Sequence, residues 1–252
     1  MRLALLSDIH ANLRAFQACL EHARAQGADR VALLGDLVGY GPEPGEVVDL
    51  AMALRQQGAL VLRGNHDLLA VHGPRPDAPR SGADVGAAWT HTRLTPAQRD
   101  FLAHLPLQAQ VGDALLVHAT ADDPPAWRYA TTAPVARRSL DAARGVGARC
   151  VFGGHVHEQR LWFLGRRGDL MPFEPTPAAP VPLAGHRRWL ATIGSVGQPR
   201  DRDPRAGYAL WEDAPQPRLT FFRVAYDHAA AADAVRRSGL PPELAQRLME
   251  GR

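Results

Sequence analysis

Five short clusters of polar residues, each at the end of an apolar run, constrain the fold of this chain more than any other feature. The clusters are Asp8-Ile9-His10, Gly35-Asp36, Gly64-Asn65-His66-Asp67, Val117-His118 and Gly153-Gly154-His155-Val156-His157. Short apolar runs are typical of buried strands, and the strand ends of an α/β sheet collect ligand-binding side chains. The clusters therefore predict one site that is built from segments far apart in the sequence.

The first third of the chain alternates between apolar runs and stretches of helical spacing. Strands are expected at Leu3–Leu6, Val31–Leu34 and Leu60–Leu62, with helices at Leu13–Ala25 and from Pro42–Pro44 to about Gln57. This order predicts a parallel sheet with right-handed crossovers. The third strand is expected to end in a loop that carries Gly64 to Asp67.

The middle of the chain is expected to be more helical. We expect a loop at Pro74–Gly82, one or two helices over Ala83–Leu105 with a break near Thr95, a hairpin of Leu107–Val111 and Ala114–His118, a helix at Val135–Arg144 and a strand at Arg149–Phe152. After His157, antiparallel strands are expected at residues 159–164, 168–173, 187–193, 206–212 and 218–224. Pro172–Pro182 reads as an exposed, extended loop, and helical residues begin at Asp227.

Together these elements predict an α/β (α+β) protein. Two packed mixed β-sheets are expected, flanked by helices in an αββα sandwich, with a metal site at the carboxyl ends of the strands. Residues 1–252 are expected to form a single domain whose last segment, 227–252, is helical.

Composition excludes several classes of protein. All 29 basic residues are arginine, the net charge is only +3, and the chain contains no block of like charges, so there is no strong nucleic-acid signal. Cys19 and Cys150 are too few for a disulfide framework and are expected to be buried. The apolar run at the N-terminus is too short for a signal sequence and no membrane span follows, so a cytoplasmic location is expected.

The clusters hold the ligand types that divalent metals prefer. Two divalent ions about 3.5–4 Å apart can clamp the attacking and leaving oxygens of a phosphoryl transfer. Asp36, which stands alone at a strand end, is the natural bridging carboxylate. Asp8 and His10 are two residues apart, as are His155 and His157, so each pair would share one side of an extended strand end. Each pair could approach one ion or divide between two.

In their order, these motifs resemble the calcineurin-like metallophosphoesterase superfamily, whose pattern is D-x-H, G-D, G-N-H-D/E, an isolated H and G-H-x-H. All five motifs are present between residues 8 and 157. The segments 35–42 (GDLVGYGP) and 194–201 (GSVGQPRD) further resemble a bacterial branch described as YfcE-like or diadenosine-tetraphosphatase-like. With these segments the resemblance covers nearly the whole chain.

The resemblance also implies roles for individual residues. One metal ion would be held by Asp8, His10, Asp36 and His157, and the second by Asp36, Asn65, His118 and His155. A water or hydroxide between the ions would be the nucleophile. His66 would stabilise the transition state or protonate the leaving oxygen, and Asp67 would orient the His66 imidazole.

Two further residues are candidate substrate contacts. Asn12 is expected either to cap the first helix or to donate to a substrate phosphate. Arg200, together with Arg202 and Arg205, forms either a basic loop suited to phosphate or a solvated surface loop.

The expected activity is dinuclear metal-dependent hydrolysis of phosphate esters. The leading substrate is a small or nucleotide-like phosphodiester, and phosphomonoesterase or dinucleoside-polyphosphate hydrolase activities are the alternatives. A non-catalytic metal-binding scaffold is the alternative from another class. Ligands from His, Asp and Asn without Cys admit Mn, Fe, Co, Ni or Zn, with Mn as the first choice. The expected partner is a small phosphate ester, with no membrane contact and no assigned oligomeric state.

Overall fold

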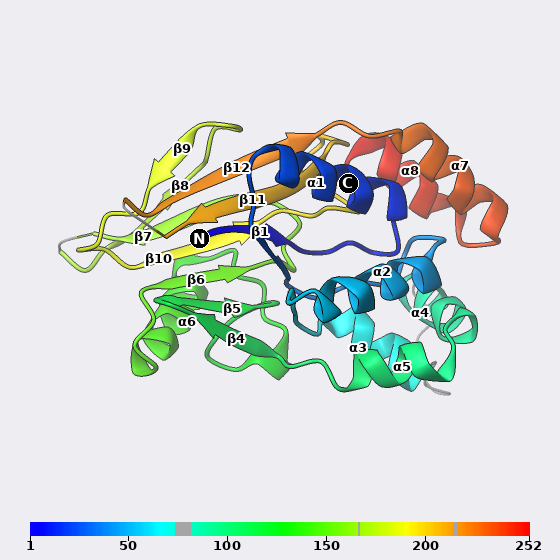
Figure 1. Ribbon diagram of the computed structural model, residues 1–252, viewed down its shortest axis with the longest axis horizontal. Helices are drawn as coiled ribbons and strands as arrows, with labels where there is room; N and C mark the ends of the chain where they lie inside the picture. The colour runs from blue at the N-terminus through cyan, green and yellow to red at the C-terminus, as the bar shows by residue number, and fades with distance from the viewer. Residues whose placement is uncertain (74–81, 166, 214–215) are drawn as a thin grey trace.

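The computed structural model describes residues 1–73, 82–165, 167–213 and 216–252 (Figure 1). Its helices are α1 Leu13–Ala25, α2 Pro44–Gln56, α3 Asn65–His72, α4 Gly82–Arg93, α5 Pro96–Ala103, α6 Ala133–Gly145, α7 His228–Ser238 and α8 Pro242–Glu250, with a short 3-10 helix, η1, at Pro124–Ala126. Its strands are β1 Arg2–Leu6, β2 Arg30–Leu33, β3 Leu60–Val61, β4 Gln108–Val111, β5 Ala114–Val117, β6 Cys150–Gly153, β7 Gln159–Leu164, β8 Leu170–Phe173, β9 Pro180–Pro182, β10 Trp189–Ile193, β11 Ala206–Glu212 and β12 Arg218–Val224.

The described strands form two mixed sheets of six strands each. One sheet has the order β3-β2-β1-β11-β12-β9, and the other has the order β4-β5-β6-β10-β7-β8. In the first sheet, β1 pairs in parallel with β2 and antiparallel with β11. In the second, β10 pairs in parallel with β6 and antiparallel with β7. The predicted fold class, two mixed sheets with flanking helices, is confirmed.

Three apolar layers hold the sandwich together, and alternate residues of β1 pack into two of them. Leu3 and Leu5 face the second sheet, in the layer where Phe152 of β6 and Trp211 of β11 meet edge to face with ring centroids 5.4 Å apart. Ala4 and Leu6 point the other way, against α1 and α2. Full burial of a leucine side chain contributes about 1.5–3 kcal/mol, so this alternation fixes which face of the strand meets which layer.

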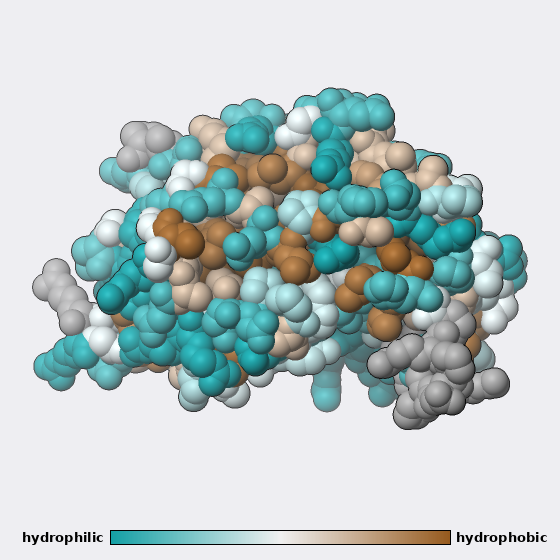
Figure 2. All heavy atoms as spheres, turned by 90° about the horizontal axis from the view of Figure 1, so that it is seen from below, coloured by the Kyte–Doolittle hydropathy of each residue, from teal (hydrophilic) through white to brown (hydrophobic). Residues whose placement is uncertain are grey.

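The third layer joins the second sheet to α6. Leu140 of this helix packs on Val117 and Val151, which lie on the outward face of β5 and β6. Helices therefore cover the outer face of both sheets, as Figure 1 shows for α1 above one sheet and α6 below the other. The lower face in Figure 2 carries hydrophilic side chains around smaller apolar patches, which is usual where the core is closed.

The later strands differ from the prediction in their pairing and in the proline-rich segment. The strand at residues 189–193 is antiparallel to one neighbour but parallel to β6, because two segments remote in sequence meet there. Part of Pro172–Pro182 is not a loop: β8 and β9 each form the edge of a sheet. Edge strands tolerate proline because one side of the backbone needs no partner.

Two helical regions also differ from the prediction. The residues after β3 do not form a loop but begin α3, so that Asn65 is its first residue. The C-terminal segment divides into α7 and α8, because Gly239 takes a left-handed conformation and prolines follow at 241 and 242. The break near Thr95 and the burial of both cysteines are confirmed. The loop predicted from Pro74 falls, except for Gly82, outside the described residues.

Within the described residues, no helix combines the length and apolar character that a membrane span requires.

Candidate dinuclear metal site

The predicted polar clusters converge at the carboxyl ends of five strands. Asp8 follows β1, Asp36 follows β2 and His66 follows β3 in one sheet, while His118 and His155 follow β5 and β6 in the other. Within each sheet these strands run parallel to one another, so their carboxyl ends share one edge of that sheet. The topology thus brings together side chains that lie far apart in sequence.

One group of potential ligands consists of Asp8, His10 and His157. The Nε2 atoms of the two histidines are 3.1 Å apart, and Asp8 Oδ1 lies 3.2 Å from His157 Nε2 and 3.8 Å from His10 Nε2. All three side chains are buried. Their ligand atoms lie within 4.8 Å of one another, which is close enough to hold one ion.

A second group consists of Asp36, His118 and His155. Asp36 Oδ2 lies 3.3 Å from His118 Nε2 in its own group and 3.8 Å from His10 Nε2 in the first group. The other oxygen, Oδ1, accepts a 2.8 Å hydrogen bond from the backbone N–H of His66. Asp36 is therefore oriented so that one oxygen faces both groups, as a bridging ligand requires.

Each of the four histidines in these groups makes a hydrogen bond to a backbone carbonyl through its other ring nitrogen. The pairs are His10 Nδ1 with Val38 O, His118 Nδ1 with Leu34 O, His155 Nε2 with Trp127 O and His157 Nδ1 with Gln198 O. A carbonyl cannot donate, so the ring nitrogen must carry the proton. In the neutral ring the remaining nitrogen then presents a lone pair toward its group, which is the arrangement typical of metal-ligating histidine.

The buried polar atoms of the site fit two divalent ions. Asp8 Oδ1, Asn65 Oδ1 and His118 Nε2 are buried without a hydrogen-bond partner. A buried polar atom that lacks a partner costs about 1–3 kcal/mol. Coordination by a cation would satisfy all three atoms, and Asn65 Oδ1 would then be the neutral oxygen that the resemblance implies for the second ion.

A left-handed backbone conformation orients several of these side chains. The φ angles are 54° at Asp8, 48° at His10, 52° at Asp36, 66° at His155 and 63° at His157. The expected extended conformation of the two histidine-containing pairs is therefore wrong. Asp8 and His10 still meet in one group, whereas His155 and His157 divide between the two. Such conformations are unfavourable for non-glycine residues and cluster at functional sites.

The charges of the site are strongly coupled. Although burial alone raises the pKa of Asp36, the neighbouring His118 and His66 rings hold it well below its usual range. For His118, burial lowers the pKa but the Asp36 carboxylate outweighs this effect and raises the pKa to about 9. Burial lowers the pKa of His155 to about 4, so this ring stays neutral and can act as a ligand near pH 7.

Asp67 does not have the role expected of it. Its Oδ1 accepts from the N–H groups of Leu37 at 2.8 Å and Val38 at 3.2 Å, and its Oδ2 accepts from Gly64 N at 2.8 Å. Among the described residues no hydrogen bond joins it to the His66 imidazole, whose Nδ1 is buried without a partner. Asp67 instead ties the loop after Asp36 to the first turn of α3.

The hydrogen bonds of Asn12 favour the helix cap over the phosphate donor. Its Oδ1 accepts from Ala15 N at 3.2 Å, which caps α1. Both hydrogens of its Nδ2 are engaged, by Gly197 O and by Tyr226 Oη at 3.1 Å each. The amide therefore has no N–H left for a substrate.

Arg200 lies beside the candidate site. Its backbone N–H donates to the carbonyl of His157, and its side chain is half-buried beside Gln198. Burial lowers the pKa of the His66 imidazole, and the charge of Arg200 adds to this effect. By contrast, the nearby Arg205 is paired with Asp203. Arg200 is therefore the better placed of the two to meet an anionic substrate.

The fold and the site match a known family over most of the chain. The calcineurin-like phosphoesterase superfamily domain matches residues 1–213. The chain belongs to this family and is a metallophosphoesterase of the calcineurin-like type.

Relatives span its whole length. A metallophosphoesterase from Sphaerobacter thermophilus is similar in structure, with a TM-score of 0.86 and 33% identity over 100% of this chain and 99% of its own. An uncharacterized protein from Methanocaldococcus jannaschii is 30% identical over 99% of this chain and 98% of its own length. A hypothetical protein from Pyrococcus horikoshii shares the fold, with a TM-score of 0.79 at 20% identity over 100% of this chain and 98% of its own.

Three aromatic residues at the site were not predicted. Tyr40 lies against His66 and His10, with ring centroids 4.5 Å and 4.7 Å apart. Tyr129 stacks on His155 at 4.1 Å, and the ring of Trp127 lies 5.8 Å from that of His118. Tyr40 was marked only by its place in the GDLVGYGP segment. The loop that carries the other two had no recognisable motif.

Proposed function

We propose that this protein hydrolyses phosphodiesters of small, nucleotide-like molecules at a dinuclear metal centre, within a single domain of residues 1–252. The observation that carries the proposal is the position of Asp36 Oδ2, which faces His118 at 3.3 Å and His10 at 3.8 Å, one histidine from each ligand group. A shared carboxylate is what a pair of closely spaced ions needs. Phosphoryl transfer is the chemistry that such a pair serves.

The ligand sets are those implied by the family motifs. Asp8, His10, Asp36 and His157 would hold one ion; Asp36, Asn65, His118 and His155 would hold the other. Manganese is the proposed metal, and Fe, Co, Ni and Zn also suit a His, Asp and Asn ligand set. When bound, the two ions supply a water activated as a nucleophile at neutral pH.

The protein's own side chains complete the reaction centre. His66 is proposed to donate to the leaving oxygen, because its ring lies 5.0 Å from that of His10, a member of the first ligand group. Asp67 holds the Asp36 loop against α3, which sets the position of the bridge. Arg200 is proposed to attract the anionic ester. Removal of a general acid such as His66 typically slows turnover by about 10²–10⁴-fold.

Tyr129 supports a nucleotide-like substrate. One face of its ring stacks on His155 with an interplanar angle of 22°, yet the residue is 51% exposed. A flat group of the substrate could therefore stack on the outer face while its phosphate reaches the metal ligands. Stacking of a base on an aromatic side chain contributes about 1–3 kcal/mol.

The reaction class is tested with a chromogenic panel. Protein stripped with a chelator is reloaded with each metal separately and supplied with p-nitrophenyl phosphate and bis(p-nitrophenyl) phosphate. The expected result is recovery only with added metal, with the diester turned over faster. Recovery without metal would contradict the whole scheme. Faster turnover of the monoester would instead make phosphomonoesterase, the alternative activity, the function.

The substrate class is tested by Tyr129→Ala, with Tyr129→Phe as the matched control that keeps the ring. We expect Tyr129→Ala to raise KM for a nucleoside phosphodiester by about tenfold, the loss of one stacking contact. KM for a methyl aryl diester should change less. Equal changes for both substrates would argue against a nucleobase on this ring. Hydrolysis of a dinucleoside polyphosphate, measured in parallel, covers the remaining alternative.

A non-catalytic scaffold is the weaker proposal, because His66 and every ligand position implied by the family are filled in this chain. A cytoplasmic location remains part of the proposal and is tested by fractionation of the producing cell.

A further inference from the structure

The segment Gly39-Tyr40-Gly41, here called the strap, crosses directly beneath the candidate catalytic histidine. A Cβ atom at Gly39, whose φ is 91°, would lie 2.8 Å from His66 Nδ1. A Cβ atom at Gly41 would lie 2.2 Å from the carbonyl oxygen of His10. Both glycines are needed because the backbone lies flat against the site and leaves no room for side chains.

Tyr40 fills the space between the two glycines and forms a wall of the site. Its ring contacts the imidazoles of His66 and His10, with centroids 4.5 Å and 4.7 Å away, and only 9% of the residue is exposed. Its φ is 61°, a left-handed conformation that is unfavourable for a bulky side chain. Such a conformation persists only where the surrounding packing determines it.

The packing around Tyr40 comes from the C-terminal helical hairpin, α7 and α8. Tyr40 belongs to one buried apolar cluster with residues of both helices and of the turn between them: Ala231, Ala232, Val235, Leu240, Leu244, Ala245 and Leu248. The hairpin begins beyond residue 213, where the match to the family domain ends. One face of Tyr40 thus meets the catalytic histidine, and the rest of the side chain meets helices that the family domain does not include.

The same C-terminal region is fastened to two other loops of the site. Tyr226 Oη, just before α7, accepts a hydrogen bond from Asn12, which follows the Asp8-Ile9-His10 motif. Gly251, at the end of α8, accepts from Arg202 N at 2.8 Å, close to Arg200. The hairpin therefore holds the edges of the site as well as the strap.

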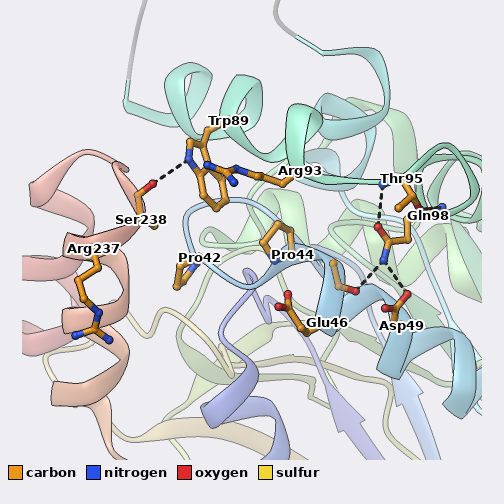
Figure 3. A pocket seen from close by; sticks show the side chains of 11 residues that line it. Pro42, Pro44, Glu46, Asp49, Trp89, Arg93, Thr95, Gln98, Arg237 and Ser238 are labelled. Carbon is orange, nitrogen blue, oxygen red and sulfur yellow. Dashed lines mark hydrogen bonds between the residues drawn. The ribbon is translucent and has the colours of Figure 1, made fainter.

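Next to the strap, a cavity lies between the hairpin and the rest of the domain. This cavity has a volume of about 590 Å³, and its lining includes Pro42 and Pro44, after the strap, and Arg237 and Ser238 at the end of α7 (Figure 3). The Trp89 indole of α4 bridges the gap by donating to Ser238 O at 3.2 Å. Beside this cavity, Tyr40 is the residue that joins the buried cluster of the hairpin to the histidines.

We propose that Tyr40 is a positioning residue for His66. The C-terminal hairpin holds Tyr40 in place and thereby sets the orientation of the His66 imidazole. The proposal rests on the proposed function, in which His66 donates to the leaving oxygen. Tyr40 touches neither the reacting atoms nor a metal in this scheme. It confines the imidazole to one orientation, and a donor displaced by about 1 Å can lose about 10²-fold in rate.

The dependence of rate on the leaving group separates positioning from simple structural support. A leaving alcohol with a high pKa needs the donor, whereas p-nitrophenolate leaves almost unaided. In Tyr40→Leu we expect kcat for an alkyl phosphodiester to fall by about 10- to 100-fold and kcat for bis(p-nitrophenyl) phosphate to fall less than about threefold. Metal content by elemental analysis and KM should stay unchanged. Tyr40→Phe, which keeps the ring, should behave as the wild type.

The contribution of the hairpin is tested by Leu244→Ala, with Leu140→Ala as its matched control. Both leucines are 1% exposed on helices, but Leu140 packs in the α6 layer, in a different cluster from Tyr40. Both variants should lower the melting temperature by a similar amount. At an assay temperature below both melting temperatures, only Leu244→Ala should show a selective fall in kcat for the alkyl diester.

The His66→Gln variant shows which of the two proposals is contradicted if Tyr40→Leu is not selectively slow. If it becomes selectively slow with the alkyl diester and Tyr40→Leu does not, His66 is the donor and the positioning proposal is overturned. If His66→Gln has the same leaving-group dependence as the wild type, the donor role in the proposed function fails instead. Loss of metal from Tyr40→Leu, with equal losses for both substrates, would also overturn positioning, because Tyr40 would then only support the fold of the site.

Discussion

Gly64→Ala adds a single methyl group at the most crowded point behind the metal ligands. The backbone of Gly64 is extended, with φ −102° and ψ 178°, so alanine can adopt it without strain. Its Cβ, however, would lie 2.1 Å from Asp36 Oδ1 and 2.3 Å from Asp36 N. Real Cβ atoms essentially never approach other atoms closer than 3.0 Å, so the carboxylate must retreat by about 0.9 Å.

That displacement is large on the scale of metal coordination. Ligand distances in metal sites vary by about 0.2 Å, so a shift of nearly 1 Å would remove Asp36 Oδ2 from both ions at once. The hydrogen bond from His66 N to Oδ1, at 2.8 Å, would be strained by the same movement. We therefore expect loss of most bound metal, a fall in kcat/KM of at least about 10²-fold and an overpacking penalty of about 1–3 kcal/mol.

Gly145→Ala is the matched control. Gly145 is the last residue of α6, its φ is not positive, and a Cβ there would meet nothing within 4 Å. This variant should keep metal and activity, with stability unchanged or raised by up to about 1 kcal/mol. The assays are elemental analysis after metal reloading, kcat/KM on the diester and thermal unfolding. A Gly64→Ala protein that held two ions and turned over at the wild-type rate would refute the argument from crowding.

Three further outcomes are expected. Asp36→Asn should abolish binding of both ions, and full metal content by elemental analysis would remove Asp36 from the bridging position. His66→Gln should retain both metals but slow turnover of an alkyl phosphodiester by about 10²–10⁴-fold, and unchanged rates with that substrate would exclude it from the mechanism. Because the Asp36 carboxylate, against the effect of burial, raises the pKa of His118 to about 9, the metal-free protein carries a proton there below that pH. Metal binding must displace this proton, so the affinity for metal should rise by about tenfold per pH unit toward pH 9. Calorimetry in buffers of different ionisation enthalpy measures the number of protons released on metal binding. Release of no proton would contradict the coupling between metal binding and His118.

The sequence predicted the secondary structure and the members of the site well, because both depend on local patterns. Apolar runs marked strands such as β1 and β6, and polar motifs at their ends marked side chains that do lie together, as with Asp8 and His157. The expectation failed where local geometry was assumed. Asp8 and His10 were expected on an extended strand end, but their backbone is left-handed because contacts with remote loops determine it.

Roles that depend on remote partners were also beyond the sequence. Asp67 follows His66 directly, which favoured a contact between them, yet its carboxylate is taken by the N–H groups of Leu37, Val38 and Gly64. Asn12 could have been a cap or a phosphate donor. Only the position of Tyr226, more than 200 residues away, uses its last N–H and decides for the cap.

By itself, the sequence determined the metal-binding chemistry of this protein, because residue type fixes which atoms can coordinate and the order of the motifs identifies the family. The tertiary structure decided how those atoms are divided: His155 and His157 separate into different groups, and one oxygen of Asp36 faces both. It also decided that the GDLVGYGP segment, through Tyr40, connects the C-terminal hairpin to His66. Contacts between segments remote in sequence depend on how the two sheets and their helices pack, and no local pattern encodes that packing.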